Sequence, residues 1–380
     1  MRINLRPLLA AALFGMPALA SAQGTLSTQG FGYPTGYLST RTLGTGGALA
    51  EIDPLSASNP SAILNLGGSA LYIQLEPEFR TLTSGSSSEK TTIARYPLAV
   101  ASIPITATVM AGISVTNLLD RSFQTVSRGS QVVSGTRLTS TNIFASDGAI
   151  GDIRVSLAWM PASWLHLGVA GHVITGDNRL SDSTHFDDST RYAPAVDSST
   201  VTYVGNALSA GAEIYTGTFG VLAASYRRGG SLSLKSGNAT LGQAHVPDRL
   251  ALSAAYLGIR GTSIAVRSAY DKWTNMRGLG SATLPITDSW DTSVGADVLG
   301  PRFMGSSLQL RAGGRWRTLP FGIPGGGDVS EKSYSFGTGS LLARGRAAID
   351  IAGIHSTRNS SATPIRESAW TLSVGLTVRP

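Results

Sequence analysis

The chain has 380 residues, of which 14% are charged, and it contains 45 glycines and no cysteine. An ordinary soluble domain is about 25% charged, and the lack of cysteine excludes disulfides, thiolate metal sites and cysteine catalysis. The formal net charge of +7 is spread along the chain without a basic run, so we expect no nucleic-acid partner. Beyond the N-terminus, no apolar stretch reaches the about 18 residues that a membrane-spanning helix needs.

Residues 1–22 have the pattern of a secretory signal peptide. Arg2 and Arg6 give a positively charged start, residues 8–19 are apolar, and residues 20–22 are the small Ala-Ser-Ala that a signal peptidase requires. The alternative is a buried helix of a folded core. Since no cysteine follows the cleavage site, a lipoprotein is excluded, and we expect the mature protein outside the inner membrane of a bacterium.

Residues 23–67 come next, without strand-like alternation and with little charge. Within them, residues 48–52 predict a single helical turn. A segment so poor in charge is not typical of a solvated tail. We therefore expect residues 23–67 to lie inside the structure that the rest of the chain forms, as a hatch or plug.

Apolar and polar residues alternate from about residue 69 to the C-terminus, which is the pattern of half-buried strands. In the last strand one face carries Trp370, Leu372, Val374, Leu376 and Val378, and the other face is polar. The alternation predicts fourteen strands at 69–82, 90–104, 105–119, 148–160, 163–176, 199–215, 218–228, 246–257, 262–273, 287–298, 305–317, 334–343, 346–355 and 367–379.

The connections between these strands alternate between short turns and long polar loops, the latter at 120–147, 177–198, 229–245, 274–286, 318–335 and 356–366. This alternation is typical of outer-membrane barrels, whose periplasmic turns are short and whose extracellular loops are long. Aromatic residues at strand ends suggest interfacial girdles: Trp159, Trp164, Tyr215, Tyr256, Trp290 and Trp316. A soluble β-sandwich or solenoid is the alternative, and it accounts less well for the long loops on one side.

We therefore predict an all-β fold, a 14-stranded antiparallel transmembrane β-barrel over residues 68–380 with residues 23–67 inside its lumen. A plugged barrel is expected to be a passive transporter and no general porin. We expect no enzyme, no cofactor and a monomer in contact with outer-membrane lipid.

Several motifs, taken in order, resemble the FadL family of outer-membrane transporters. Residues 46–48, 53–54 and 59–62 are similar to the hatch segment of that family, with Ser61 where its Asn-Pro-Ala element has alanine. Residues 245–250 and 270–273 are similar to its central hairpin, and 313–320, 336–339 and Asp350 to its late strands. Unlike most outer-membrane strands, the last one ends without an aromatic residue, at residues 378–380.

The resemblance implies passive uptake of hydrophobic compounds such as long-chain fatty acids across the bacterial outer membrane. The binding pocket of the family cannot be placed on this sequence residue by residue. The PorV-like outer-membrane shuttle proteins of a protein secretion system resemble the same barrel and hatch, so a secretion component stays an alternative, as does a porin.

Charged residues gather on the inward strand faces, among them Arg311 and Arg315 near Asp291 and Asp297. Arginine binds carboxylates in a bidentate manner, so Arg311 and Arg315 are candidate partners for an anionic headgroup. Alternatively, a polar lumen needs paired charges to hold the plug in place. We favour this structural role.

Asn59 and Pro60 are the candidate gating residues. Proline fixes its own φ and pushes the preceding residue to an extended conformation, and an asparagine side chain caps nearby backbone N–H groups. We expect a sharp turn where the plug meets the barrel wall, with either a gating role or a role in assembly only.

Neither a metal site nor a catalytic site is predicted. His166 and His172 lie on one strand face about 20 Å apart, too far to share an ion. The loop 177–198 holds five aspartates, but their spacing matches no known Ca²⁺ loop. A serine elbow opening a helix is also missing from the sequence.

Overall fold

The computed structural model describes residues 31–133, 136–279, 285–303, 306–323, 327–361 and 363–379. The predicted signal peptide and residues 23–30 of the predicted plug lie outside this range. The strands are β1 (Ala70–Ser84), β2 (Ser87–Arg95), β3 (Leu98–Thr106), β4 (Val109–Asp120), β5 (Phe123–Val133), β6 (Thr136–Ala162), β7 (Leu165–Phe186), β8 (Ala195–Tyr215), β9 (Gly220–Ser236), β10 (Ala239–His245), β11 (Asp248–Tyr256), β12 (Thr262–Lys272), β13 (Ser289–Phe303), β14 (Ser306–Gly322), β15 (Asp328–Leu342), β16 (Ala347–Ser360) and β17 (Arg366–Val378). No helix among the described residues is long and apolar enough to cross a membrane.

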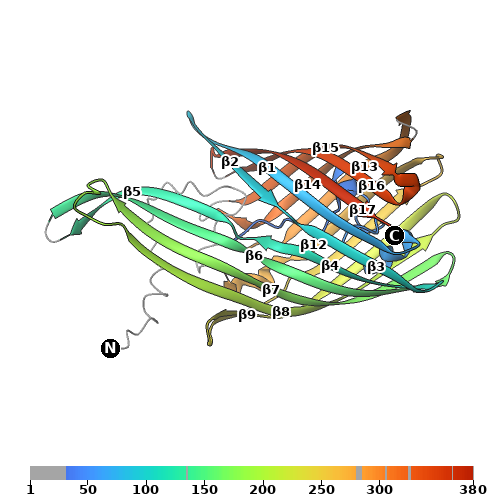
Figure 1. Ribbon diagram of the computed structural model, residues 1–380, viewed down its shortest axis with the longest axis horizontal. Helices are drawn as coiled ribbons and strands as arrows, with labels where there is room; N and C mark the ends of the chain where they lie inside the picture. Colours follow the sequence, from blue (N-terminus) through green and yellow to red (C-terminus); the bar gives the residue numbers. More distant parts are fainter. Residues whose placement is uncertain are drawn as a thin grey trace.

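These segments form one closed antiparallel barrel, in which β1 pairs with β17 from Leu71 opposite Val378 to Thr83 opposite Arg366. Three barrel positions are each made of two consecutive segments: β2 with β3 beside β1, β4 with β5 beside β6, and β10 with β11 beside β9. The seventeen segments therefore occupy fourteen positions around the barrel. The predicted fourteen-stranded barrel is confirmed (Figure 1).

Prolines mark two of the three interruptions, at Pro97 between β2 and β3 and at Pro247 between β10 and β11. A proline has no N–H for the strand ladder, so pairing stops there. The third interruption follows Asp120, which pairs with Tyr33 from inside the barrel through backbone hydrogen bonds of 2.7 and 2.8 Å. At this point the wall is paired both within the barrel, to β6, and to the N-terminal segment.

The prediction of long polar loops at 120–147, 177–198 and 229–245 is wrong for most of each range. These residues continue β5 to β10 as paired hairpins, for example Phe123 opposite Ser146 and Gln131 opposite Leu138. Figure 1 shows β5 to β8 extending far past the other strands. Ser- and Thr-rich sequence forms a strand when a partner completes its backbone hydrogen bonds, even without an apolar face.

The outward face of the barrel is apolar, as the alternation predicts. Exposed positions include Leu71, Ile73, Val155, Leu157, Val169, Val173, Leu252, Val266, Trp290, Trp316, Trp370 and Leu372. A contiguous apolar face of this size is suited to hydrocarbon. Tyr215 corrects the predicted girdle, because its hydroxyl group points inward and lies within hydrogen-bond distance of the Asn65 side-chain carbonyl, at 2.8 Å, and of the Glu213 carboxylate, at 2.9 Å.

Residues 31–69, here called the N-terminal segment, lie inside the barrel and contact its inner wall. They contain the helix α2 (Thr40–Gly44) and the 3-10 helix η1 (Pro60–Leu66). Ser39 caps α2 by accepting a hydrogen bond from the backbone N–H of Thr42. The predicted helical turn at 48–52 is a run of hydrogen-bonded turns, and the only α-helix in the described part of the chain begins earlier, at Thr40.

Candidate functional site: the barrel interior

The inward side chains change character along the barrel axis. On β7 the inward positions run from Gly168 through His172 to Ile174, that is, from small to ionisable to apolar. The order recurs on β6, from Ser156 through Arg154 to Ile150, and on β9, from Ser225 through Arg227 to Leu232. We call the three zones the glycine level, the charged belt and the apolar level.

The glycine level is where the backbone of the N-terminal segment touches the wall. A Cβ atom at Gly168 would lie 2.4 Å from the Ser61 nitrogen, and one at Gly313 would lie 2.2 Å from the Thr45 carbonyl. Only a residue without a Cβ allows two backbones to approach so closely. The wall is therefore shaped to receive the N-terminal segment in one position.

The predicted gating residues lie at this level. Asn59 is extended (φ −106°, ψ 122°) and caps η1 by accepting from the Ser61 backbone N–H at 3.0 Å, while Pro60 occupies the first turn. The Asn59 amide donates to the Glu51 carbonyl at 2.8 Å. The Asn59 Oδ1 packs so closely against Gly211 that a Cβ there would come within 1.8 Å. The structure thus places this turn of the N-terminal segment directly against the wall; its gating role stays a prediction.

The charged belt is a ring of buried ionisable side chains around the N-terminal segment: Glu78, Arg95, Asp152, Arg154, Arg227, Arg249, Arg267, Asp271, Asp291, Arg315, Arg317, Glu331, Arg358 and Glu367. Glu51 of the N-terminal segment enters the ring and is fully buried. Its carboxylate accepts from Arg267 at 3.1 Å, from Arg249 at 3.3 Å and from the Ser225 hydroxyl at 2.6 Å. One acidic side chain therefore joins the segment to β9, β11 and β12.

Tyr33 is the second such contact. Its ring lies among the guanidinium groups of Arg80, Arg95, Arg317 and Arg358, at 4.6 to 5.4 Å, a distance at which cations interact with aromatic faces. Its hydroxyl donates to Glu331 at 2.9 Å and accepts from Arg358 at 2.9 Å.

Burial raises the pKa of the Tyr33 hydroxyl above its ordinary value, against the opposing influence of Arg317 and Arg358. The hydroxyl therefore keeps its proton and can donate to Glu331. A buried charge without its partner costs about 3–5 kcal/mol. Together, Glu51 and Tyr33 fix the N-terminal segment in the lumen through groups that cannot be left unpaired.

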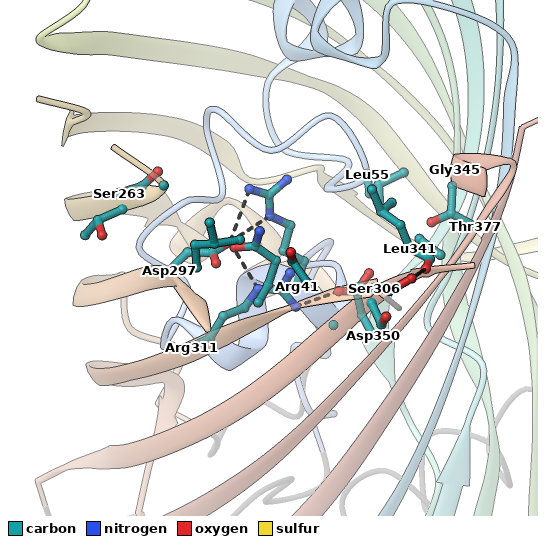
Figure 2. Close-up of a pocket in the computed structure, with 18 of the residues that line it drawn as sticks. Arg41, Leu55, Ser263, Asp297, Ser306, Arg311, Leu341, Gly345, Asp350 and Thr377 are labelled. Atoms are coloured by element: carbon teal, nitrogen blue, oxygen red, sulfur yellow. Dashed lines mark hydrogen bonds and ion pairs between the residues drawn. The ribbon is translucent and has the colours of Figure 1, made fainter. Parts of the chain in front are cut away.

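The candidate headgroup residues Arg311 and Arg315 are already paired in this arrangement. Arg311 donates to Asp297 at 3.1 Å and to Asp350 at 2.5 Å, and Arg315 donates to Asp291 at 2.7 Å. The N-terminal segment joins the first group, since Arg41 contacts the same Asp297 carboxylate at 3.2 Å. Figure 2 shows Arg41 and Arg311 converging on Asp297 from the segment and from β14. These contacts fit the structural role favoured above.

The apolar level lies on the far side of the charged belt from η1. Its buried members are Phe31, Leu119, Ile150, Ile174, Val201, Tyr203, Leu232, Val246, Trp273, Met276, Leu319, Phe321 and Val329. Phe31 packs edge-on against Trp273 and Phe321, with ring centroids 6.2 and 6.5 Å apart. The lumen of a membrane barrel is generally polar, so an apolar zone inside one is a candidate site for an apolar solute.

Beside this zone the barrel wall divides. Among the described residues, β2 pairs with β1 and β5 pairs with β6, but β2 and β5 do not pair with each other. The segments next to them along the chain, β3 and β4, do pair with each other. A cavity of about 490 Å³ lies between the two hairpins, lined by Arg80, Leu82, Glu89, Ile93, Phe123, Val126 and Asp147 among others.

One constellation has the geometry of a catalytic triad. His172 contacts Asp152 through Nδ1 at 2.9 Å and the Ser209 hydroxyl through Nε2 at 2.8 Å. The cavity beside Ser209 measures only about 10 Å³, which is about the space of a single water molecule. A substrate acyl group does not fit there, and we assign these residues to the polar network of the lumen. Among the described residues, no group of three His, Asp or Glu side chains is arranged to hold a metal.

Sequence reasoning missed Glu51 and Tyr33. Glu51 stands nearly alone as a charge in residues 23–67, with Arg41 and Asp53 as the others. An isolated carboxylate in an otherwise uncharged, buried segment requires a cationic partner, and this signal was available. Tyr33 carried no such signal, because a tyrosine beside Gly32 and Pro34 is ordinary in a loop.

No family model matches the sequence, and no curated protein matches it. Solved structures do. A FadL homologue from Pseudomonas aeruginosa has a TM-score of 0.64 at 12% identity, covering 92% of this chain and 99% of its own. The toluene transporter TodX from Pseudomonas putida has a TM-score of 0.57 at 15% identity, with 90% and 97% covered. A monoaromatic hydrocarbon channel, CymD, has a TM-score of 0.57 at 12% identity, with 90% and 97% covered. The chain has the fold of these barrels, as its motifs predicted.

Proposed function

We propose that this barrel of FadL-type fold resides in the bacterial outer membrane and passively transports apolar compounds, such as long-chain fatty acids or monoaromatic hydrocarbons. The predicted signal peptide and the apolar outward face support the location. The single observation that carries the transport role is the apolar level inside the lumen. A structural barrel has no need to bury Phe31, Trp273 and Phe321 together inside its lumen, whereas an apolar solute needs such a site to leave water.

The N-terminal segment is the plug of this transporter. It fills the lumen from the glycine level to Phe31, so a solute in the apolar level has two ways onward. It passes along the lumen when the N-terminal segment shifts, or sideways between the hairpins where the wall divides. An enzymatic role is not supported by the Ser209–His172–Asp152 group, because the cavity beside Ser209 measures only about 10 Å³.

A disulfide lock distinguishes these routes. The Thr40 and Ser373 hydroxyl groups are 2.8 Å apart, and the chain has no cysteine of its own. The pair Thr40→Cys and Ser373→Cys therefore joins the N-terminal segment to β17. Uptake of radiolabelled hexadecanoate and toluene is measured in Gram-negative cells without their own transporter for these compounds.

If the N-terminal segment moves during transport, the locked protein takes up little solute and a reductant restores uptake. Each single cysteine variant serves as the control. Full uptake by the locked protein assigns the route to the divided wall. If the unlocked protein takes up neither compound, the proposed function is wrong.

Single-channel conductance separates a plugged transporter from a porin. The wild-type protein is expected to be silent, and deletion of residues 23–60 is expected to open a steady ion current. A wild-type protein that already conducts like a porin contradicts the plug. Co-purification with a secreted protein and without any apolar ligand favours the secretion-shuttle alternative.

A further inference from the structure

A large cavity opens at the end of the barrel that holds the C-terminus, on the far side of the N-terminal segment from the apolar level. It has a volume of about 860 Å³, within the about 300–1,000 Å³ typical of ligand sites. Its roof is Arg41 and Leu55 of the N-terminal segment, and its walls come from β12 to β17 and their turns. Figure 2 shows Leu55 and Leu341 toward the right of the view and Asp297 with Arg311 toward the left.

Apolar side chains face this cavity in the inward register of the strands. Leu299 continues the inward series of Asp297, and Leu341 that of Gly339; they are 49% and 51% exposed. Leu257 and Leu55 also line the cavity. Leaving a leucine in water instead of burying it forgoes about 1.5–3 kcal/mol. Inward leucines at a wet barrel mouth are therefore explained by an apolar group that covers them.

Cationic side chains stand at the rim of the same cavity. Arg344 and Arg379 line it and are exposed, and neither forms an ion pair with any described residue, in contrast to the paired Arg41 and Arg311. Arg344 is held in the left-handed region (φ 59°, ψ 35°), which is uncommon for a residue with a side chain. Arg379 is fixed by its backbone N–H, which donates to the Arg346 carbonyl at 2.7 Å.

We propose that this cavity binds an amphiphile with one anionic headgroup, whose chain covers Leu257, Leu299 and Leu341 and whose carboxylate or phosphate pairs with Arg344 and Arg379. The inference rests on the proposed function only in taking this end as the periplasmic exit. An uncharged hydrocarbon makes no use of two unpaired arginines. The cavity therefore selects for amphiphiles at the last step of transport. The apolar level, which the solute meets earlier, does not discriminate between solutes by charge.

Binding to the purified full-length protein in phosphatidylcholine nanodiscs tests this site without any transport step. Hexadecanoate is compared with hexadecanol, which has the same chain and no charge. The double variant Arg344→Gln/Arg379→Gln is expected to weaken hexadecanoate binding about 10- to 100-fold, since each charge-assisted contact contributes about tenfold, and to change hexadecanol binding less than about threefold. Leu299→Ser/Leu341→Ser is expected to weaken both ligands.

Arg346→Gln is the matched control, because Arg346 belongs to the same turn, is exposed and does not line the cavity. Equal loss of hexadecanoate binding in Arg346→Gln and in the double variant overturns the proposal, as does unchanged binding in the double variant or no binding by the wild type. Adding phosphatidylglycerol to the nanodiscs identifies the source of the headgroup. Competition with hexadecanoate that depends on Arg344 and Arg379 supports the site with a membrane phospholipid as its occupant, and lack of competition supports the site with a transported amphiphile.

This binding result does not depend on the outcome of the uptake assay, so the proposed site and the proposed function fail separately.

Discussion

The charged belt and the apolar level adjoin each other in one lumen, and the N-terminal segment contacts both. In the charged belt, Glu51 and Tyr33 each meet specific partners at hydrogen-bond distance. In the apolar level, Phe31 packs into a cluster of apolar side chains and is held there by ring contacts in place of hydrogen bonds or ion pairs. Paired buried charges permit one arrangement, because any shift leaves a charge uncompensated. An apolar cluster tolerates replacement of one apolar group by another of similar volume. The belt therefore sets the position of the N-terminal segment, and the apolar level can exchange its occupant.

Replacing Glu51 by alanine tests the belt most severely. The change removes the carboxylate that Arg249 and Arg267 share and leaves each with one other partner, Asp271 or Asp291. Because the buried positive charge is then only partly compensated, we expect a loss of about 3–5 kcal/mol, measured as the free energy of unfolding in urea titrations in lipid vesicles. Asp197→Ala, at an exposed acid outside the lumen, is the control and is expected to have no effect. A Glu51→Ala protein as stable as the wild type shows that the belt does not hold the segment.

A charge on the outward face gives the next largest effect. Leu167→Arg or Val374→Arg on the outward face of the barrel should destabilise the barrel in lipid, by about 2–4 kcal/mol where the position lies near the bilayer midplane. Val132→Arg is the matched control, since Val132 is exposed on the hairpin that extends beyond the other strands, where the penalty falls toward zero. Equal stability of all three variants means that the facing of the strands is assigned incorrectly.

The turn at the glycine level is expected to matter less for stability. Asn59→Ala removes the cap of η1, which costs about 0.5–2 kcal/mol, and Pro60→Ala costs less. Uptake decides what the turn does. If apolar uptake is lost while the barrel assembles normally, the turn is a gate; unchanged uptake, or failure of the barrel to assemble, leaves it an architectural element.

The smallest effect is expected in the apolar level. Ile174→Val removes one methylene group and should cost about 0.5–1.5 kcal/mol, with a change in uptake that depends on the size of the solute. If Ile174→Val lowers the free energy of unfolding as much as Glu51→Ala does, the proposed difference between the charged belt and the apolar level is wrong. Kinetics of uptake with solutes of increasing size provide the measurement.

The outward alternation made the barrel predictable, because strands that face lipid on one side carry a period of two, as in 370–378. The extended hairpins were missed because their Ser- and Thr-rich strands have no apolar face to mark them. The pairing of Arg311 and Arg315 with Asp297 and Asp291 followed from adjacent inward positions, while Arg317 pairs with Glu331 at 2.7 Å on the other neighbouring strand. Adjacency alone does not decide which of two flanking carboxylates an arginine selects.

The contacts of the N-terminal segment also impose an order on assembly. Thr40 meets Ser373 and Tyr33 meets Arg358, so the residues made first are bound by those made last. Contacts so distant in sequence form only after the intervening chain has closed, and such topologies fold slowly. The full set of contacts that holds the N-terminal segment is therefore complete only when β17 joins β1 and the barrel closes.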